Sequence, residues 1–314
     1  MVKYLLKRLG LMIITLFVVV TATFFLMSSM PGNPVRAQAK KLPEEVAKQM
    51  EIKYGLDKPI SERYVIYLKN LVKGDFGDSF VTPGTTVVDK VHDNLPASAT
   101  LGLLSVGFGL LVGVTLGIIA AYRRGSKIDF VVMFIAILGV SIPSFVLATL
   151  LQTTLGGVGG LPIAGWYDSS TPFLERIRFV ILPNLALSFG GIATYARYMR
   201  ASVLDVVGQD YILTAQAKGL SSFKISIRHI LRNAILPIIT IVGPQLAVII
   251  TGTVVIERIF AIPGLGNALI DAIYTKDYNI IMGLTVFFSG LYILSILIVD
   301  ILYSVIDPRI KLEG

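Results

Sequence analysis

The sequence predicts an all-α membrane protein with six transmembrane helices. Of its 314 residues, 54% are hydrophobic and only 15% are charged, against about 25% charged in a soluble domain. The mean hydropathy is +0.76. The apolar residues also gather into runs of about 20, the length at which a helix crosses the hydrocarbon core with its backbone groups satisfied. These runs are 9–29, 98–122, 129–155, 181–200, 235–257 and 281–303.

The first run follows Lys3, Lys7 and Arg8 and superficially resembles a secretory signal. The apolar core of a signal peptide is about 7–15 residues long. The run 9–29 is longer than that. We therefore expect it to be retained as the first transmembrane helix.

The segment between the first two runs has its own helical pattern. Residues 43–54 predict a short polar helix that begins with Pro-Glu-Glu, and residues 60–73 predict a second one. Tyr64, Tyr67 and two leucines, Leu68 and Leu71, share one face at helical spacing. A turn-rich stretch, KGDFGDSFVTPGT, follows. Two interpretations stay open and are compatible: a helical cap on the outer ends of the spans, or a docking surface for an extracytoplasmic partner.

Small residues and prolines predict how the runs pack and bend. Gly109, Gly113 and Gly117 are spaced by four residues and form a flat stripe for close helix contact. Pro143, Pro237 and Pro244 are expected to kink the third and fifth runs or to mark where they begin.

The positive charges predict the orientation of the chain. Lys and Arg are frequent before the first run, in the turn 123–128, in the long connection 197–234 and in the C-terminal tail. The short loops 156–180 and 258–280 carry two each. The positive-inside rule places both termini and the connection 197–234 in the cytoplasm. The net charge of +8 is then explained by orientation, and we expect contact with membrane lipid and no binding of nucleic acid.

The residues for catalysis are missing from the sequence. There is no cysteine and no Gly-Lys dipeptide, so thiolate chemistry and a P-loop are excluded. The two histidines, His92 and His229, lie outside the runs, and no H-E-x-x-H motif occurs. We expect no catalytic residue, no metal site and no cofactor in this chain.

The apolar runs also lack the ionisable residues of a coupling-ion site. Asp300 lies near the end of the sixth run, where we expect it to be solvated or paired with Arg197 or Arg200. Ion-coupled transporters usually keep ionisable groups near the bilayer midplane. The energy for transport must therefore come from another protein, or the chain is a passive pore.

The connection 197–234 predicts an elbow of two helices. Alanines and long side chains favour a helix before Gly219, which permits a tight turn. The chain restarts as a helix near Ser221 and Ser222, either of which can cap it. An apolar side is formed by Ile225, Ile227, Ile230 and Leu231, opposite the basic residues Lys224, Arg228 and Arg232. An amphipathic helix on anionic lipid explains the basic face but not the small residues before Gly219.

This elbow resembles the EAA loop of permeases of type I ABC importers. The matching stretches are TAQAKGLSSF and ILRNAILP. Leu213 stands where the general motif has Glu, and Gly219 matches the motif's glycine. The final pair, Leu236-Pro237, lies five residues farther from the glycine than in the general motif. These departures are similar to those of the oligopeptide/dipeptide permease branch.

Three further stretches resemble the B-type subunit of that branch. They are YGLDKPISERYVIYLKNLVKGDFGDSF at 54–80, GTVVIERIFAIPGLGNALIDAIYTKDYNII at 252–281, and DPRIK at 307–311. Asp277-Tyr278-Asn279 departs from the usual Asp-Tyr-Pro of the family. Together the similarity extends over nearly the whole chain.

The resemblance implies the type I ABC importer permease fold and a division of labour among subunits. This chain would pair with a second, C-type permease, and two ATPase subunits would bind ATP and magnesium. An extracytoplasmic peptide-binding lipoprotein or periplasmic protein would deliver the peptide to this protein of the bacterial cytoplasmic membrane. The implied ATPase-docking residues are Thr214, Ala215, Ala217, Lys218, Gly219, Leu220 and Ser221. An outer gate or binding-protein contact is implied for Glu257, Phe260, Pro263 and Gly264.

The expected segments are a first helix with its extracytoplasmic portion (1–97), a five-helix core (98–304) and a cytoplasmic tail (305–314). The substrate stays open within the family, because relatives with these motifs carry oligopeptides, dipeptides, glutathione or nickel complexes. Outside the family, the alternatives are a secondary transporter or channel that works alone, and a membrane scaffold without transport.

Overall fold

The computed structural model describes residues 2–30, 44–250 and 254–306. Within these ranges the regular elements are helices, with one isolated bridge between Asp78 and Thr86. This confirms the predicted all-α class. The DPRIK stretch, and with it the predicted tail from residue 307, lies outside the described residues. The chain divides into two compact units: residues 1–97 with 263–294, and residues 98–262 with 295–311. Each is described separately, and the predicted division at residues 97 and 304 stays a prediction.

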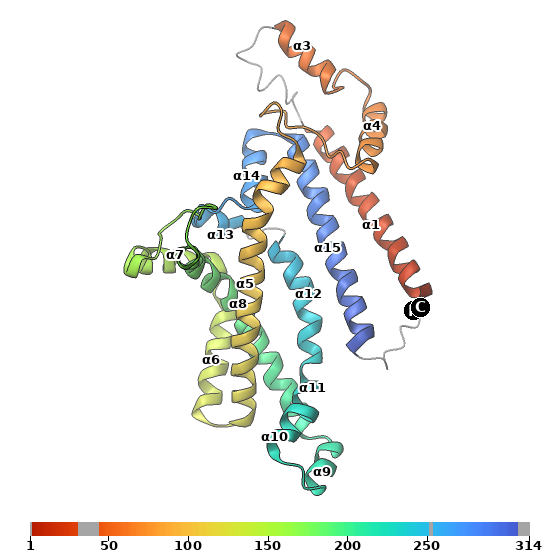
Figure 1. Ribbon diagram of the computed structural model, residues 1–314. Coiled ribbons are helices and arrows are strands. Elements are labelled where there is room, and N and C mark those ends of the chain that lie inside the picture. The colour runs from red at the N-terminus through yellow and green to blue at the C-terminus, as the bar shows by residue number, and fades with distance from the viewer. Residues whose placement is uncertain (1, 31–43, 251–253, 307–314) are drawn as a thin grey trace. The chain divides into compact units, whose positions relative to one another are not determined.

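Among the described residues, four helices are long and apolar enough to cross a membrane, and Figure 1 shows where they lie. They are α1 (Val2–Ser28), α5 (Val87–Tyr122), α8 (Phe173–Val207) and α15 (Tyr278–Ile306). Two bent helix pairs pass the same test of length and composition. The count reaches the predicted six if each bent pair forms one span.

The third apolar run is broken rather than continuous. It forms α6 (Lys127–Ser141) and α7 (Ser144–Leu155), whose axes differ by 102°. Ile142 is extended, with φ −84° and ψ 119°, because a residue before proline is disfavoured in the α region. Pro143 itself cannot donate a helical hydrogen bond. The prediction of a kink at Pro143 is confirmed. That residues 129–155 form a single span stays a prediction.

The fifth run is entered through a series of short helical segments. A bend of 40° separates Ser222–Ala234 from Leu236–Gly243. Pro237 lies in the first turn of the second part, where its missing N–H costs no hydrogen bond. The entering segments are α10 (Ser222–Ile225), the π-helical η3 (Ser226–Leu231) and α11 (Arg232–Ala234). The run itself forms α12 (Leu236–Ile250), and α13 (Val254–Ile259) follows later in the chain.

The glycine stripe of α5 packs against α8, as predicted. A Cβ atom on Gly113 would lie 2.7 Å from the Ile192 carbonyl oxygen, and one on Gly117 would lie 2.5 Å from that of Ala196. Backbones approach this closely only where a side chain is absent. Gly107, on the same helix, has nothing within 4 Å. The stripe therefore fixes the contact between these two helices.

The cap, which we define as residues 44–86, contains both predicted helices. They are α3 (Glu44–Lys53) and α4 (Ile60–Val72). Helix α4 packs on α1: the rings of Phe24 and Tyr67 stack at 5.4 Å between centroids, and the Tyr64 hydroxyl lies 2.7 Å from Thr21 Oγ1. The predicted packing of the cap on the first span is therefore confirmed. Its docking to a partner stays a prediction.

The loop after α4 is held by the start of α15. The buried Asp277 accepts hydrogen bonds from the Ser79 hydroxyl and from the Phe80 N–H, the latter at 3.0 Å. Asn279 donates its side-chain N–H to the Asp78 carbonyl at 2.9 Å. Asn279 stands where the family usually has the proline of Asp-Tyr-Pro. Its side-chain hydrogen bond is a contact that proline cannot make. In the same unit, α14 (Leu265–Thr275) contributes Leu265 and Ala272 to a core with Val87.

Candidate functional site

The elbow forms where α8 ends and a short helix takes over (Figure 1). Helix α8 ends at its C-cap residue Gly208, and α9 (Asp210–Ala217) begins two residues later. A turn then leads into α10. The predicted order of helix, glycine and helix is confirmed.

Gly219 closes α9 with a Schellman motif. Its φ angle is +72°, in the left-handed region that glycine enters without a Cβ penalty. Its N–H donates to the Gln216 carbonyl at 2.9 Å, and the Leu220 N–H donates to the Ala215 carbonyl at 3.3 Å. This pair of bonds satisfies carbonyls that the helix end leaves unpaired. No atom lies within 4 Å of the place of a Gly219 Cβ, so this glycine is required by the backbone conformation and not by crowding within the chain.

The predicted docking residues divide into an outer and an inner group. Thr214, Ala217, Lys218, Gly219 and Ser221 are exposed, and Leu220 is half-buried. Ala215 is only 5% exposed and belongs to the core beneath the elbow. The Ala215 side chain therefore holds the elbow in place instead of forming part of its outer surface.

The restart after the turn differs from the prediction in two details. Ser221 occupies the N-cap position of α10 but makes no side-chain capping bond. Ile225 and Ile230 are buried, yet Ile227 is 48% exposed. The reason is helical spacing, because two residues correspond to about 200° of rotation on a helix with 3.6 residues per turn, which puts Ile227 on the opposite side from Ile225.

Exposed apolar side chains flank the turn, and they were not among the predicted site residues. Leu213 is 59% exposed and Phe223 is 76% exposed. Exposed apolar side chains of this size are available for contact with another molecule. The signal in the sequence was an apolar residue on each side of the glycine, outside the expected buried face.

A filled core and two polar contacts support the elbow from below. Ile212, Ala215 and Ile225 pack with residues of α8, including Met199 and Val203. The Tyr122 hydroxyl at the end of α5 lies 2.5 Å from the Ser226 hydroxyl. On the elbow itself, Asn233 donates its side-chain N–H to the Tyr211 hydroxyl at 3.2 Å. The elbow is therefore packed against α8 and bonded to the end of α5.

An ion pair joins the start of α6 to α8, ten residues before α9 begins. Arg200 donates from Nε and Nη2 to the two carboxylate oxygens of Asp129, at 2.5 and 2.7 Å. The Gly125 N–H also donates to Asp129, at 2.9 Å. The prediction had considered Arg200 as a partner for Asp300, whereas its guanidinium is engaged with Asp129. A pair 71 residues apart leaves no periodic signal in the sequence.

The predicted outer-gate residues are mostly enclosed. Glu257 and Phe260 are 0% and 2% exposed, and Gly264 is buried, whereas Pro263 is exposed. Glu257 accepts a hydrogen bond from the Ser98 hydroxyl at 2.8 Å, and the Phe260 carbonyl accepts one from the Gly165 N–H at 2.7 Å. Contact between these two side chains and another protein would require α13 to move, so their role stays a prediction.

Within the described ranges, no cluster of three or more His, Asp or Glu side chains has the arrangement of a metal site. The elbow offers backbone turns, exposed apolar side chains and basic side chains, among them Lys218 and Lys224, which suit contact with another surface.

Comparison with protein families decides between the classes that the sequence left open. Residues 113–312 match the family described as "Binding-protein-dependent transport system inner membrane component". Residues 1–102 match the corresponding N-terminal family. The chain belongs to this family of inner membrane components. It is thus a multi-pass membrane permease of the kind that works with a binding protein.

Named relatives match this permease over its full length. The dipeptide transport system permease protein DppB of Bacillus subtilis is 42% identical over 100% of this chain and 99% of its own. The oligopeptide transport system permease protein OppB of Escherichia coli is 41% identical over 99% of this chain and 100% of its own. A crystal structure of an amino acid ABC transporter with histidines matches at 17% identity and a TM-score of 0.48, covering 70% of this chain and 94% of that one.

Proposed function

We propose that this chain is the B-type permease subunit of an ATP-driven importer that moves peptides across the bacterial cytoplasmic membrane. The full-length similarity to proteins named as dipeptide and oligopeptide permeases supports the substrate class. The bias of Lys and Arg in the connections supports a cytoplasmic position for both termini and for the elbow.

The observation that carries the proposal is the construction of the elbow. Exposed residues, among them Leu213, Ala217 and Phe223, surround a Gly219 turn that has open space around it. Beneath them lies a closed core shared with α8. This is the arrangement of a small, rigid knob that inserts into a groove of another protein. The ATPase subunit is that protein, and it binds the ATP and magnesium that this chain does not.

The mechanism is transmission of a rigid-body movement. Closure of the two ATPase subunits on ATP pulls the two elbows, one on this chain and one on a C-type permease. Because the elbow packs on α8, and Arg200 of α8 is paired with Asp129 of α6, the movement reaches both helices together. The path then faces the extracytoplasmic binding protein, and hydrolysis resets it. This subunit performs no chemistry itself.

The experiment compares the same substitution at two exposed glycines. Gly219 and Gly157 both have positive φ, +72° and +84°, and at both positions no atom lies within 4 Å of the place that a Cβ would take. Glutamate at either position therefore meets the same backbone strain of about 1–2 kcal/mol. In the complete transporter, we expect Gly219→Glu to abolish ATP-dependent peptide uptake while the subunit stays in the membrane. Gly157→Glu should retain uptake.

Normal uptake by Gly219→Glu would exclude docking through the elbow. Loss of uptake in both variants, with normal membrane levels, would show that the effect is not specific to the elbow. ATP-dependent uptake of a nickel complex or of glutathione, with no uptake of peptides, would contradict the proposed substrate.

A further inference from the structure

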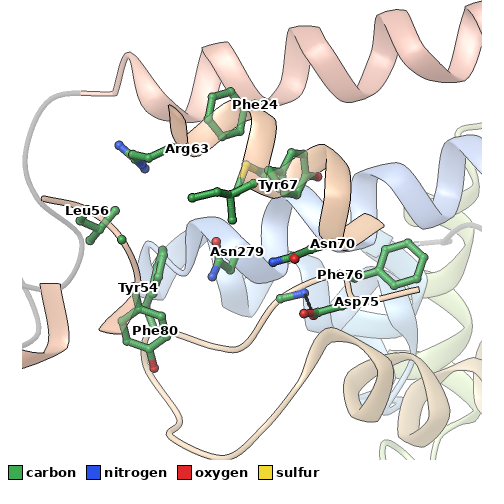
Figure 2. Close-up of a pocket in the computed structure, with 14 residues that line it drawn as sticks. Phe24, Tyr54, Leu56, Arg63, Tyr67, Asn70, Asp75, Phe76, Phe80 and Asn279 are labelled. Carbon is green, nitrogen blue, oxygen red and sulfur yellow. Dashed lines mark hydrogen bonds between the residues drawn. The ribbon is translucent and has the colours of Figure 1, made fainter. Parts of the chain in front are cut away.

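A pocket of about 130 Å³ lies beside helix α4 of the cap (Figure 2). Its walls come from α1, α4, the turn-rich loop after α4 and the start of α15. Its two charged residues, Arg63 and Asp75, have opposite signs and lie on opposite sides of it. The Tyr67 hydroxyl is buried and is not available to a ligand. The pocket therefore favours neither sign of charge, and we assign no ligand to it.

A glutamine in the fifth apolar run lies at the middle of the membrane. Gln245 belongs to α12 and follows the start of the run, residue 235, by ten positions. At 1.5 Å per residue this is about 15 Å, half the thickness of the hydrocarbon core. Gly191 of α8 also lies ten positions into its run, 181–200. A Cβ atom on Gly191 would lie 3.4 Å from Gln245 Nε2, so the two mid-run positions meet.

Helix α8 fixes the amide of Gln245. The Tyr195 hydroxyl donates to Gln245 Oε1 at 2.6 Å, and Tyr195 is fully buried. The amide nitrogen rests against Gly191, where no side chain intervenes. Both contacts come from this chain, so the amide is oriented without help from another subunit. A polar group positioned in advance is usual for a binding site.

The nitrogen of the same amide has donors without an acceptor. Gln245 Nε2 carries two N–H groups, and no described residue accepts a hydrogen bond from them. Gln245 is half-buried, so part of its side chain is accessible. Lipid tails offer no acceptor, and an unsatisfied polar group in hydrocarbon is costly. The accessible side of Gln245 therefore faces the path, where water or a polar ligand supplies the acceptor.

We propose that Gln245 Nε2 donates a hydrogen bond to a main-chain carbonyl of the peptide as it passes the middle of the membrane. The inference rests on the proposed function as a peptide importer. Every peptide carries such carbonyls, and a neutral amide pairs with them whatever the neighbouring side chains are. It neither attracts nor repels a charged peptide as an ionised residue would. Tyr195 is a positioning residue, because it acts only through the amide.

The first experiment traps the peptide in the complete transporter. The chain has no cysteine, so Gln245→Cys adds a single thiol to it. The probe is Ala-Cys-Ala with its thiol activated as a pyridyl disulfide, which joins the two by thiol exchange and releases pyridinethione. During ATP-dependent import we expect at least about tenfold more product with Gln245→Cys than with Thr240→Cys. Thr240 is five positions away on α12, which is about 140° of rotation.

The second experiment measures import kinetics. Gln245→Met keeps a side chain of similar length and removes the amide. With one hydrogen bond lost, the maximal import rate should fall about fivefold, equally for Ala-Ala-Ala and Ala-Glu-Ala. The half-saturating concentration should not change, because the binding protein captures the peptide. Co-purification of all subunits shows that the variant assembles.

Two further variants serve as controls for these kinetics. Thr240→Val removes a hydroxyl that is already bonded to the Leu236 carbonyl of the same helix, at 3.1 Å, and should import normally. Tyr195→Phe should lower the maximal rate about twofold in the unchanged chain. It should have no further effect in Gln245→Met, because the amide on which it acts is gone.

A normal maximal rate in Gln245→Met, or no trapped peptide at Gln245→Cys, would overturn the proposal. A loss that differs between the two peptides would exclude recognition of the main chain. Loss of the second permease from the purified Gln245→Met complex would assign the amide to a contact between subunits and also overturn it. Failure of these tests in a transporter that imports peptide removes this contact alone, whereas absence of peptide import by the unchanged transporter removes the proposed function.

Discussion

The elbow around Gly219 presents exposed apolar side chains above a filled core, whereas the pocket beside α4 encloses an unfilled space within half-buried walls. In the elbow, Leu213 and Phe223 face outward and Ala215 closes the core below. In the cap, the Tyr67 hydroxyl is buried and has no hydrogen-bond partner among the described residues. The two regions therefore differ in packing and should respond differently to substitution.

The largest effect on stability is expected at the ion pair between Asp129 and Arg200. Asp129→Asn should lower the free energy of unfolding by about 3 kcal/mol, because it leaves the Arg200 guanidinium without its counter-charge in a largely buried position. Denaturation in detergent micelles measures this change.

The exposed pair Lys58–Glu62 of the cap provides the control. Glu62→Gln should give no measurable change, since exposed ion pairs contribute little. Equal effects at the two pairs would contradict the importance of burial for the Asp129–Arg200 pair.

A smaller effect is expected from filling the glycine stripe behind the elbow. Gly117→Ala should cost about 2 kcal/mol, because its Cβ would lie 2.7 Å from that of Met199 and would push α5 from α8. Gly107→Ala has open space and should be neutral or stabilising by about 0.5 kcal/mol. Thermal unfolding in the same lipid compares them. A neutral Gly117→Ala would show that these helices are not in tight contact.

The smallest effect distinguishes two tyrosines of the cap. Tyr64→Phe should cost about 1 kcal/mol, because it removes the hydrogen bond to Thr21. Tyr67→Phe should cost nothing, since its hydroxyl has no partner among the described residues. The difference in unfolding free energy between the two variants is the measurement, and a larger loss in Tyr67→Phe would contradict an unbonded hydroxyl at this position.

The pH dependence of the stability of the cap follows from Tyr67. Burial raises the pKa of Tyr67 to about 12 from 10.0. The folded state then holds this proton more tightly than the unfolded state. The contribution of this hydroxyl to the free energy of unfolding is therefore complete below about pH 10 and is lost as the pH rises toward 12. Unfolding measured across this range should show a loss that is absent in Tyr67→Phe. An identical pH profile for both proteins would contradict the burial of this hydroxyl.

Local chemistry made some features predictable from the sequence. Gly219 requires a left-handed turn whatever surrounds it, and the spacing of Gly109, Gly113 and Gly117 defines a helix stripe by itself. The presence of a break at Pro143 was equally local. Its angle of 102° was not, because the packing of α7 sets the direction in which the chain leaves the proline.

The remaining features depend on contacts between distant segments. Asp129 and Arg200 form one ion pair across 71 positions. The walls of the pocket include Phe24, Tyr67 and Asn279, which belong to three separate helices. The inward position of Ala215 beside the outward Thr214 depends on how α9 rests on α8. Periodicity within one segment contains none of this information.

The most direct test of the elbow uses the absence of cysteine from the chain. In the assembled transporter, a single Ala217→Cys variant places a thiol on the exposed side of α9, and Ala215→Cys places one in the core. We predict that a short bifunctional thiol reagent joins the first variant to an engineered cysteine in the ATPase groove and that ATP changes the yield. Ala215→Cys should give no product. Absence of a product from Ala217→Cys, in a complex that still imports peptide, would contradict the claim that the ATPase subunit docks at the elbow.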